Sequence, residues 1–281
     1  MTAALIDGKA LAQKIRNTLR EKIAKLPATP ILAVILVGNN AASQIYVRAK
    51  EKACQETGIK TQTIILPDSI TQQQLLETIT ELNINDKING ILVQLPLPKH
   101  LDEKTILSAI SPIKDIDGFH PLNTGLMIQK IKDTYLPCTP KGIIYMLHSL
   151  HQNLEGLHAV VIGRSQIVGI PTAHLLLNEN CTVTVAHSRT KNLAEICRSA
   201  DILIVAVGKP ELITKDYIKP NAIIIDVGIN RTENGLKGDV CFADAAELAS
   251  YITPVPGGVG PMTIAMLLEN TYEAFLKQNN S

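Results

Sequence analysis

The sequence predicts an α/β protein with two domains, each built on a mostly parallel sheet. Its 281 residues exceed the usual size of a single core, and 46% of them are hydrophobic, which is enough to fill two cores. Apolar runs of strand length alternate with helical patterns, and continuous runs of this kind are typical of parallel strands covered by helices on both faces. These runs lie at residues 31–37, 61–66, 90–95, 158–163, 181–186, 201–207 and 222–227.

Helical patterns fill the intervals between these runs. The chain opens with an amphipathic pattern inside residues 1–23, and a second helix is indicated from Ala42 to Thr57. The stretch SPIKDIDGFHPLNTG at 111–125 contains several turn-forming residues, so we expect it to be irregular and to form the hinge region. A last helix is expected to start near Met262.

This pattern predicts the domain boundaries. We place an N-terminal α/β domain at residues 1–137 and a nucleotide-binding domain at residues 138–262. Residues 263–281 form the closing helix, which we expect to pack back on the N-terminal domain.

The composition excludes several classes of partner. The net charge is only +1, so no positive field attracts nucleic acid or a membrane surface, and a chain with 3% aromatic residues and no Trp is poorly suited to stacking bases. The odd number of cysteines, without a CxxC pair, predicts free thiols in a reducing compartment, and the N-terminus lacks the apolar core of a signal peptide. We expect a cytoplasmic protein that binds a small molecule.

The stretch VVIGRSQIVGIP at 160–171 is a candidate phosphate-binding turn. A Rossmann turn needs a glycine where the first strand stops, a backbone that approaches the pyrophosphate, and a small residue where helix meets strand. Gly163 follows the strand, Ser165 stands where a second glycine is expected, and Gly169 comes after a longer loop. The serine can offer both a hydroxyl and an N–H to phosphate. On this motif alone, a glycine-bounded turn without a ligand remains an alternative.

The next strand favours NADP over NAD. It ends in HSRT at 187–190, without the carboxylate that accepts hydrogen bonds from the ribose 2′-OH of NAD. Ser188 and Arg189 would instead bind a 2′-phosphate, with Arg164 as a second cation. A solvated basic loop is the alternative.

Several blocks along the chain occur in the order found in one enzyme family. They are ASQIYVRAKEKACQETGI (42–59), GILVQLPLP (90–98), KDIDGFHPLNTG (114–125), PCTPKG (137–142), GRSQIVGIP (163–171), HSRT (187–190), DVGIN (226–230), GDV (238–240) and PVPGGVGPMTIAMLLENT (254–271). With these blocks the chain resembles the bifunctional methylenetetrahydrofolate dehydrogenase/cyclohydrolases over nearly its whole length. It departs from the family at 39–41, Asn-Asn-Ala, where acidic residues and a proline are common, and we expect this to affect the stiffness of the loop more than the chemistry.

The resemblance implies a substrate domain and a Rossmann-like NADP-binding domain with a cleft between them. It implies that NADP⁺ oxidises 5,10-methylenetetrahydrofolate to the 5,10-methenyl form, which water then opens to 10-formyltetrahydrofolate. These steps belong to one-carbon metabolism and to the synthesis of purines, histidine and methionine. The folate derivatives are the expected partners, and a homodimer is implied as well.

The N-terminal site residues come from three of these blocks. Tyr46 and Lys50 are four apart and share one helix face, where a phenol can stack on a pterin and the amine can reach the one-carbon unit. A lysine can act in general acid/base catalysis when burial and a cationic substrate disfavour its charged form. Gln94, followed by Leu95, ends a strand at the ligand-binding edge of the sheet, and its amide can hold both a lysine and a ring oxygen.

A surface lysine and a loop-capping glutamine are the alternatives for Lys50 and Gln94. The acid that binds the pterin in the family matches Asp117; Asp115 is the competing carboxylate, and an Asx turn is the alternative role for either. The resemblance assigns catalysis to Lys50, Gln94 and Asp117, and substrate binding to these three, Tyr46 and Leu95.

The remaining site residues lie in the C-terminal half. In PVPGGVGP (254–261), the resemblance makes the segment with Gly257, Gly258 and Pro261 a wall that contacts the ligands, while a plain turn before the helix is the alternative. It also assigns Ile229 to the cofactor, together with Gly163, Arg164, Ser165, Ser188 and Arg189.

Other readings carry less weight. The spacing of Tyr46 and Lys50 also matches the short-chain dehydrogenases, but there the pair follows the nucleotide turn. His148 and His151 lie three apart but have no further ligand close in sequence, so we expect no metal site. A shikimate- or amino-acid-type NADP dehydrogenase and a catalytically silent NADP-binding protein stay open as alternatives.

Overall fold

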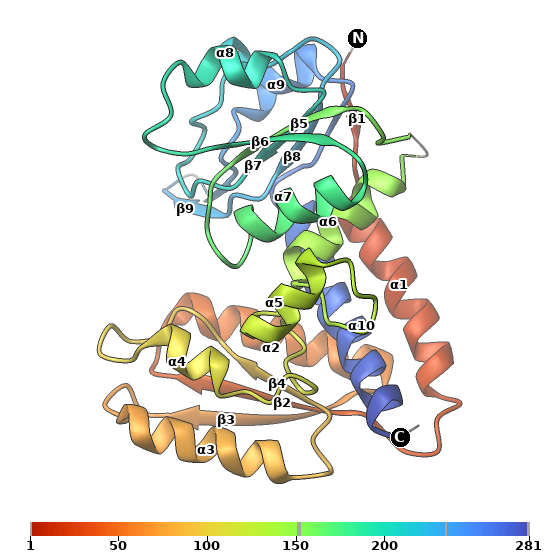
Figure 1. Cartoon of the computed structure of the whole chain (residues 1–281), viewed down its shortest axis with the longest axis vertical. Coiled ribbons are helices and arrows are strands. Elements are labelled where there is room, and N and C mark those ends of the chain that lie inside the picture. Colours follow the sequence, from red (N-terminus) through yellow and green to blue (C-terminus); the bar gives the residue numbers. More distant parts are fainter. Residues whose placement is uncertain (1, 151–152, 234, 280–281) are drawn as a thin grey trace. The chain divides into compact units, whose positions relative to one another are not determined.

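The computed structural model describes residues 2–150, 153–233 and 235–279 (Figure 1). The chain forms two compact units, unit 1 with Met1–Ala12 and Thr139–Thr263, and unit 2 with Gln13–Cys138 and Ile264–Ser281. Two long helices, α1 (Gly8–Ile23) and α10 (Val259–Asn279), contribute residues to both units.

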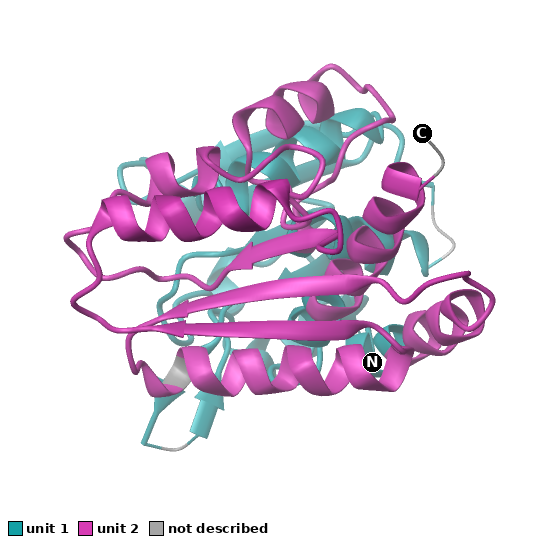
Figure 2. Ribbon diagram, turned by 90° about the horizontal axis from the view of Figure 1, so that it is seen from below, with its two compact units in different colours: residues 1–12, 139–263 teal, residues 13–138, 264–281 magenta. Residues whose placement is uncertain are grey.

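Unit 2 is built on a three-stranded parallel sheet in the order β3-β2-β4. The strands are β2 (Ile31–Val37), β3 (Lys60–Leu66) and β4 (Gly90–Val93). The helices are α2 (Ala41–Thr57), α3 (Gln72–Ile84), α4 (Glu103–Ser108) and α5 (Pro121–Ile128). Figure 2 shows the three strands of unit 2 between helices, which explains why β2 and β4 are almost entirely apolar.

Unit 1 contains a six-stranded parallel sheet in the order β1-β11-β8-β7-β5-β6. Its strands are β1 (Ala4–Leu5), β5 (His158–Ile162), β6 (Thr182–Ala186), β7 (Ile202–Val205), β8 (Ile223–Asp226) and β11 (Tyr251–Ile252). A two-stranded hairpin of β9 (Asn230–Thr232) and β10 (Gly235–Lys237) follows β8. The helices of this unit are α6 (Cys138–His148), α7 (Gly169–Asn178), α8 (Leu193–Arg198) and α9 (Phe242–Leu248), with a short 3₁₀ turn, η1, at Lys215–Tyr217.

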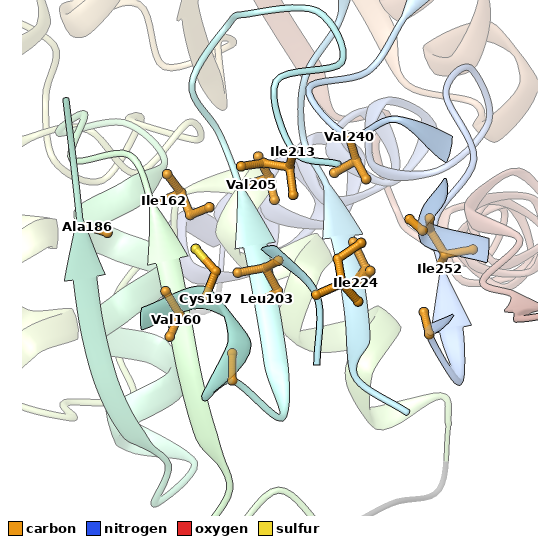
Figure 3. Close-up of a cluster of buried hydrophobic side chains, with 14 residues drawn as sticks. Val160, Ile162, Ala186, Cys197, Leu203, Val205, Ile213, Ile224, Val240 and Ile252 are labelled. Atoms are coloured by element: carbon orange, nitrogen blue, oxygen red, sulfur yellow. The ribbon is translucent and has the colours of Figure 1, made fainter. Parts of the chain in front are cut away.

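The core of unit 1 joins four neighbouring strands. Figure 3 shows Val160 and Ile162 of β5, Leu203 and Val205 of β7, and Ile224 of β8 in one hydrophobic cluster with Ile252 of β11. Because alternate residues of a strand point to the same face, one layer of side chains can hold these strands in register.

The predicted fold class is confirmed, and each predicted apolar run contains a strand. Two local predictions were wrong. Residues 121–125 are not irregular but open helix α5, because Pro121 suits a first helical position and His120 Nδ1 accepts a hydrogen bond from Leu122 N. Helix α10 starts at Val259 rather than near Met262, since Pro261 falls in the first turn, where its missing N–H has no intrahelical partner to lose.

The N-terminal strand pairs far from its place in the sequence. Ala4 and Leu5 of β1 pair with Tyr251 and Ile252 of β11, so the first residues complete the sheet of unit 1.

None of the helices in the described part of the chain is long and apolar enough to cross a membrane. All five cysteines are free.

Candidate active site

Helix α2 and strand β4 bring Lys50 and Gln94 together in unit 2. Lys50 Nζ donates a hydrogen bond to Gln94 Oε1 at 3.0 Å, and Gln94 Nε2 donates to the carbonyl of Leu95 at 2.7 Å. The second bond orients the amide, so its oxygen faces the lysine. Gln94 N also donates to Ile35 O, which fixes the start of this loop to the central strand. Tyr46, Lys50, Gln94 and Leu95 are all half-buried.

Asp117 belongs to the same group. Burial raises the pKa of Asp117, and the positive charge of Lys50 opposes this rise in the pKa. The two groups are therefore close enough to interact electrostatically. The thiol of Cys138 also lowers the pKa of Asp117 slightly, and Cys138 Sγ donates to the carbonyl of Ile116 at 3.3 Å.

The structure separates the two carboxylates that competed for the ligand role. Asp115 is buried and accepts hydrogen bonds from Phe119 N at 3.2 Å, His120 N at 2.8 Å and Asn123 Nδ2 at 2.8 Å. It thus holds the turn that leads into helix α5. Its donors lie four and five residues further on, so this is not the Asx turn considered for either residue, in which the side chain bonds two residues on. Asp117 has no comparable set of backbone donors among the described residues, which leaves its oxygens for a ligand.

Two residues that the sequence analysis missed hold the loop around Asp117. Lys114 is buried and donates from Nζ to the carbonyls of Leu82, Asn83 and Asn85, where helix α3 ends. Asn270 of α10 is fully buried and donates from Nδ2 to the carbonyls of Ile116 and Leu136 at 2.8 and 3.0 Å. No sequence pattern indicates these contacts.

The departure from the family at 39–41 lies at the start of helix α2. Asn40 Oδ1 accepts a hydrogen bond from Ser43 N at 3.1 Å, so Asn40 caps the helix that carries Tyr46 and Lys50. The cap needs a side-chain oxygen at this position, and an amide supplies it as well as a carboxylate does.

The glycines of the nucleotide turn in unit 1 are required by close packing. Gly163 has φ +126°, and a Cβ on it would lie 2.3 Å from Ala206 O, at the end of the neighbouring strand β7. A Cβ on Gly169, the first residue of α7, would lie 2.2 Å from Gly163 O. The turn therefore brings strand, loop and helix together as a dinucleotide-binding turn requires.

Ser165 organises this turn. Its Oγ accepts hydrogen bonds from Val168 N at 3.2 Å and Gly169 N at 3.3 Å, and Ser165 O accepts one from Ile170 N. In both side-chain bonds Ser165 Oγ is the acceptor, so its hydroxyl hydrogen can still be donated to a ligand. Within the described residues no acceptor faces the backbone N–H groups of 165–167, and such N–H groups before a helix suit a phosphate.

Strand β6 ends beside this turn. Ile162 pairs with Ala186, and Gly163 N donates to Ala186 O, so the residues that follow β5 and β6 lie at the same edge of the sheet. After β6, His187 N donates to Thr190 Oγ1, which forms a tight turn and leaves Ser188 and Arg189 exposed. Arg164 is exposed as well. These groups fit a dinucleotide with a 2′-phosphate.

The remaining predicted residues cluster around the start of α10. A Cβ on Gly8 would lie 1.9 Å from Gly258 O, and Lys9 N donates to Gly257 O, so the two glycines serve close backbone packing within unit 1. Pro261 lies in the first turn of α10. Ile229 is 43% exposed, and its Cδ1 would lie 3.5 Å from a Cβ on Gly260. A role of these residues in ligand binding stays a prediction.

Of the two histidines considered as metal ligands, the structure describes only His148. His148 Nε2 lies 3.1 Å from Glu179 Oε2, a pair at the surface, and His151 lies outside the described residues. Over the described ranges no group of three or more His, Cys, Asp or Glu side chains is arranged to hold a metal ion.

Two family models match the chain. One describes the tetrahydrofolate dehydrogenase/cyclohydrolase catalytic domain and matches residues 6–117; the other describes the NAD(P)-binding domain of the same enzymes and matches residues 137–279.

Curated and solved proteins resemble the chain over its whole length. The bifunctional protein FolD of Streptococcus equi subsp. zooepidemicus is 56% identical over 279 residues, 98% of each chain. The crystal structure of the bifunctional methylenetetrahydrofolate dehydrogenase/cyclohydrolase FolD from Campylobacter jejuni has a TM-score of 0.96 at 50% identity and 99% coverage of both chains. The FolD of Trypanosoma brucei, solved in complex with NADP and an inhibitor, has a TM-score of 0.95 at 39% identity and full coverage of both chains.

Proposed function

The chain belongs to the tetrahydrofolate dehydrogenase/cyclohydrolase family, and we propose that Lys50, Gln94 and Asp117 are the residues with which it performs the chemistry of that family. It is an NADP-dependent methylenetetrahydrofolate dehydrogenase and methenyltetrahydrofolate cyclohydrolase of one-carbon metabolism. Because the chain belongs to this family, it is neither a shikimate- or amino-acid-type dehydrogenase nor a catalytically silent NADP-binding protein. The hydrogen bond of 3.0 Å between Lys50 Nζ and Gln94 Oε1, next to Asp117, carries the proposal for the catalytic group.

Lys50 acts as the general acid/base in hydrolysis. Water that attacks the methenyl carbon must lose a proton, and a ring nitrogen must gain one when its C–N bond breaks. Gln94 holds the amine through a neutral amide oxygen, which accepts a hydrogen bond from either an amine or an ammonium group. A proton can therefore leave or reach Lys50 while the hydrogen bond to Gln94 is kept.

Asp117 and Tyr46 orient the pterin. The carboxylate of Asp117 can accept two parallel N–H donors of an aminopyrimidinone, because Asp115 already serves the hydrogen bonds of the loop. Tyr46 lies one helical turn before Lys50, which suits a ring that stacks on the pterin while the lysine reaches the one-carbon unit. Leu95 adds apolar contact beside Gln94.

NADP⁺, when bound, would supply the acceptor for the hydride of the methylene carbon. The N–H groups of 165–167 and the hydroxyl of Ser165 bind the pyrophosphate, and Gly163 allows its close approach. Arg164, Ser188 and Arg189 bind the 2′-phosphate, so NADP⁺ is preferred to NAD⁺, and Ile229 lines the site.

We also propose a homodimer in the cytoplasm, for which the family resemblance is the support. Light scattering coupled to gel filtration measures the mass, and a monomer at micromolar concentration would exclude the dimer.

A spectrophotometric assay tests the function. With methylenetetrahydrofolate and NADP⁺, NADPH should form and methenyltetrahydrofolate should decay by hydrolysis; with NAD⁺ the rate should be lower. Supplied methenyltetrahydrofolate should decay without any cofactor. Reduction of NADP⁺ without enzymatic decay of the methenyl compound would contradict the cyclohydrolase function.

A further inference from the structure

The strand order of unit 1 predicts where the second half of the cofactor lies. The chain passes from β5 to β6 on one side and then returns to β7 on the other side of β5, so the order reverses between β5 and β7. Dinucleotides bind across such a reversal, at the carboxyl ends of the strands. With the pyrophosphate after β5 and the 2′-phosphate after β6, the nicotinamide half must extend over the ends of β7 and β8.

One buried carboxylate holds the loops at the ends of both strands. Asp239 is fully buried, and its Oδ2 accepts hydrogen bonds from Val207 N at 2.6 Å and Gly208 N at 2.9 Å. Its Oδ1 accepts from Lys209 N at 2.9 Å and from Asn230 Nδ2 at 2.8 Å. Three successive N–H groups after β7 and one side chain after β8 thus converge on a single side chain.

The loops are shaped to make room for this carboxylate. A Cβ on Gly228 would lie 2.3 Å from the carboxylate of Asp239, so only glycine fits there. The carboxylate of Asp226, at the end of β8, accepts hydrogen bonds from Asp239 N and Val240 N and so fixes the backbone of Asp239. Burying a carboxylate is costly unless hydrogen bonds satisfy it, and Asp239 has four.

The orientation of these N–H groups also sets the direction of two carbonyl groups. In a trans peptide the C=O points opposite to the N–H. Because Gly208 N and Lys209 N point at Asp239, the carbonyls of Val207 and Gly208 point away from it, and no donor to either carbonyl is found within the described ranges. Gly208 is exposed, with φ +66°.

We propose that Asp239 is the positioning residue for the nicotinamide half of NADP: it holds the loop 207–209 so that the carbonyls of Val207 and Gly208 accept hydrogen bonds from the carboxamide NH₂. This inference rests on the proposed binding of NADP to unit 1. The carboxamide is the one group of the nicotinamide ring that donates hydrogen bonds, and its orientation decides which face and angle the ring presents to the hydride donor. Neither Asp239 nor the loop 207–209 contacts the reacting atoms in this arrangement.

Asp239→Asn tests the role with minimal change of shape. The substitution replaces one acceptor oxygen by an NH₂ group that faces N–H donors, so the loop must move. Because misplacement by about 1 Å can cost about 10²-fold, we expect a loss of that order in kcat/KM for NADP⁺. The preference for NADP⁺ over its 3-acetylpyridine analogue, which lacks the NH₂ group, should shrink toward one. The Kd of 2′,5′-ADP, a probe of the adenosine half, should stay at the parent value.

The matched control is Asp201→Asn. Asp201 lies just before β7, at the opposite end of the strand, and its carboxylate also accepts a backbone hydrogen bond, from His158 N at 2.9 Å. This variant should keep the parent kcat/KM, analogue preference and 2′,5′-ADP affinity. A milder variant, Asn230→Ala, removes one of the four donors to Asp239 and should change the analogue preference in the same direction by a smaller factor.

Each outcome decides the inference. Loss of analogue preference with 2′,5′-ADP binding retained supports it. Unchanged preference in Asp239→Asn, or a parallel loss of 2′,5′-ADP affinity, overturns it; if Asp239→Asn does not fold, the preference of Asn230→Ala decides in the same way. If the parent enzyme itself fails to bind 2′,5′-ADP, the proposed cofactor site is wrong instead.

Discussion

The two units build their candidate sites from different groups. In unit 2 the proposed functional atoms belong to the side chains of Lys50, Gln94 and Asp117, each held by hydrogen bonds or by burial. In unit 1 they belong largely to the backbone, at a turn where Gly163 and Gly169 let strand and helix approach closely. Proton transfer needs a titratable side chain, whereas a phosphate is bound well by N–H groups before a helix. We therefore expect a single exposed side chain to matter far less in unit 1 than a single functional group in unit 2.

The largest expected effect is that of Lys50→Met. General acid/base catalysis contributes about 10²–10⁴-fold, so hydrolysis of methenyltetrahydrofolate should fall by that order. Hydride transfer needs alignment rather than a proton from the protein, and should persist. The variant should then accumulate methenyltetrahydrofolate in the presence of NADP⁺, which absorbance detects.

Lys52→Met is the matched control, because Lys52 lies on the same helix but is exposed. It should hydrolyse the methenyl compound at the parent rate. If Lys50→Met does so too, Lys50 is not the catalytic group, and Tyr46 or a water held by Gln94 takes its place.

A second prediction concerns Asp226, the buried acid at the end of β8 in unit 1. Burial raises the pKa of Asp226 from 3.8 to about 6. The folded protein thus binds this proton more tightly than the unfolded chain, so the stabilisation is complete below about pH 4 and is lost as the pH rises through about 6. A shift of this size corresponds to about 3 kcal/mol in the free energy of unfolding.

Denaturant titrations at about pH 4, 5, 6 and 7 measure this effect in the parent and in Asp226→Asn, across the window that the linkage relation defines. The variant is expected to be less stable, because its NH₂ group faces backbone donors. Its free energy of unfolding should lack the part that decreases between pH 4 and about pH 6 in the parent. Equal pH dependence in the two proteins would assign the effect to other groups.

Arg164→Ala should have a smaller effect, on cofactor choice alone. Losing one cation from an exposed phosphate site costs about 1–3 kcal/mol, so the Kd of NADP⁺ should rise while that of NAD⁺ stays nearly unchanged. Isothermal titration calorimetry with both cofactors measures the two constants. If the Kd values of NADP⁺ and NAD⁺ rise equally, Arg164 does not bind the 2′-phosphate. If Arg164→Ala slows hydrolysis as much as Lys50→Met does, the expected difference between the two units is wrong.

The smallest effect is expected at the cap of helix α2. Asn40→Ala removes the hydrogen bond to Ser43 N and should cost about 1 kcal/mol, which lowers the thermal midpoint by a few degrees without a change in kcat. Asn39→Ala is the control, since Asn39 is exposed and its side chain does not cap the helix. An equal drop for both variants would show that the cap is not the cause.

The elements could be predicted because their patterns are local. Buried parallel strands appear as continuous apolar runs, as in β2 and β5, and the spacing of Tyr46 and Lys50 on one helix follows from its period. The ends of elements were less predictable. Helix α5 begins inside the stretch expected to be irregular, because His120 supplies a cap, and α10 begins before Met262, because Pro261 is tolerated in a first turn.

Contacts between distant residues could not be predicted in this way. Asn270 meets the carbonyl of Ile116 across 154 positions of sequence, and the two-residue strand β1 pairs with β11 without any pattern of its own. The blocks DVGIN and GDV were recognised only as family resemblance, although Asp226 and Asp239 within them hold the loops of unit 1.

The sequence by itself determined the positions of the seven apolar strands, the spacing of Tyr46 and Lys50, and the absence of a carboxylate after β6. Only the tertiary structure decided which of Asp115 and Asp117 stays available for a ligand, and which group holds Lys50. The physical reason is that periodicity reports burial along one element, whereas a buried polar group takes its partners from whatever donors and acceptors the packed chain brings within about 3 Å.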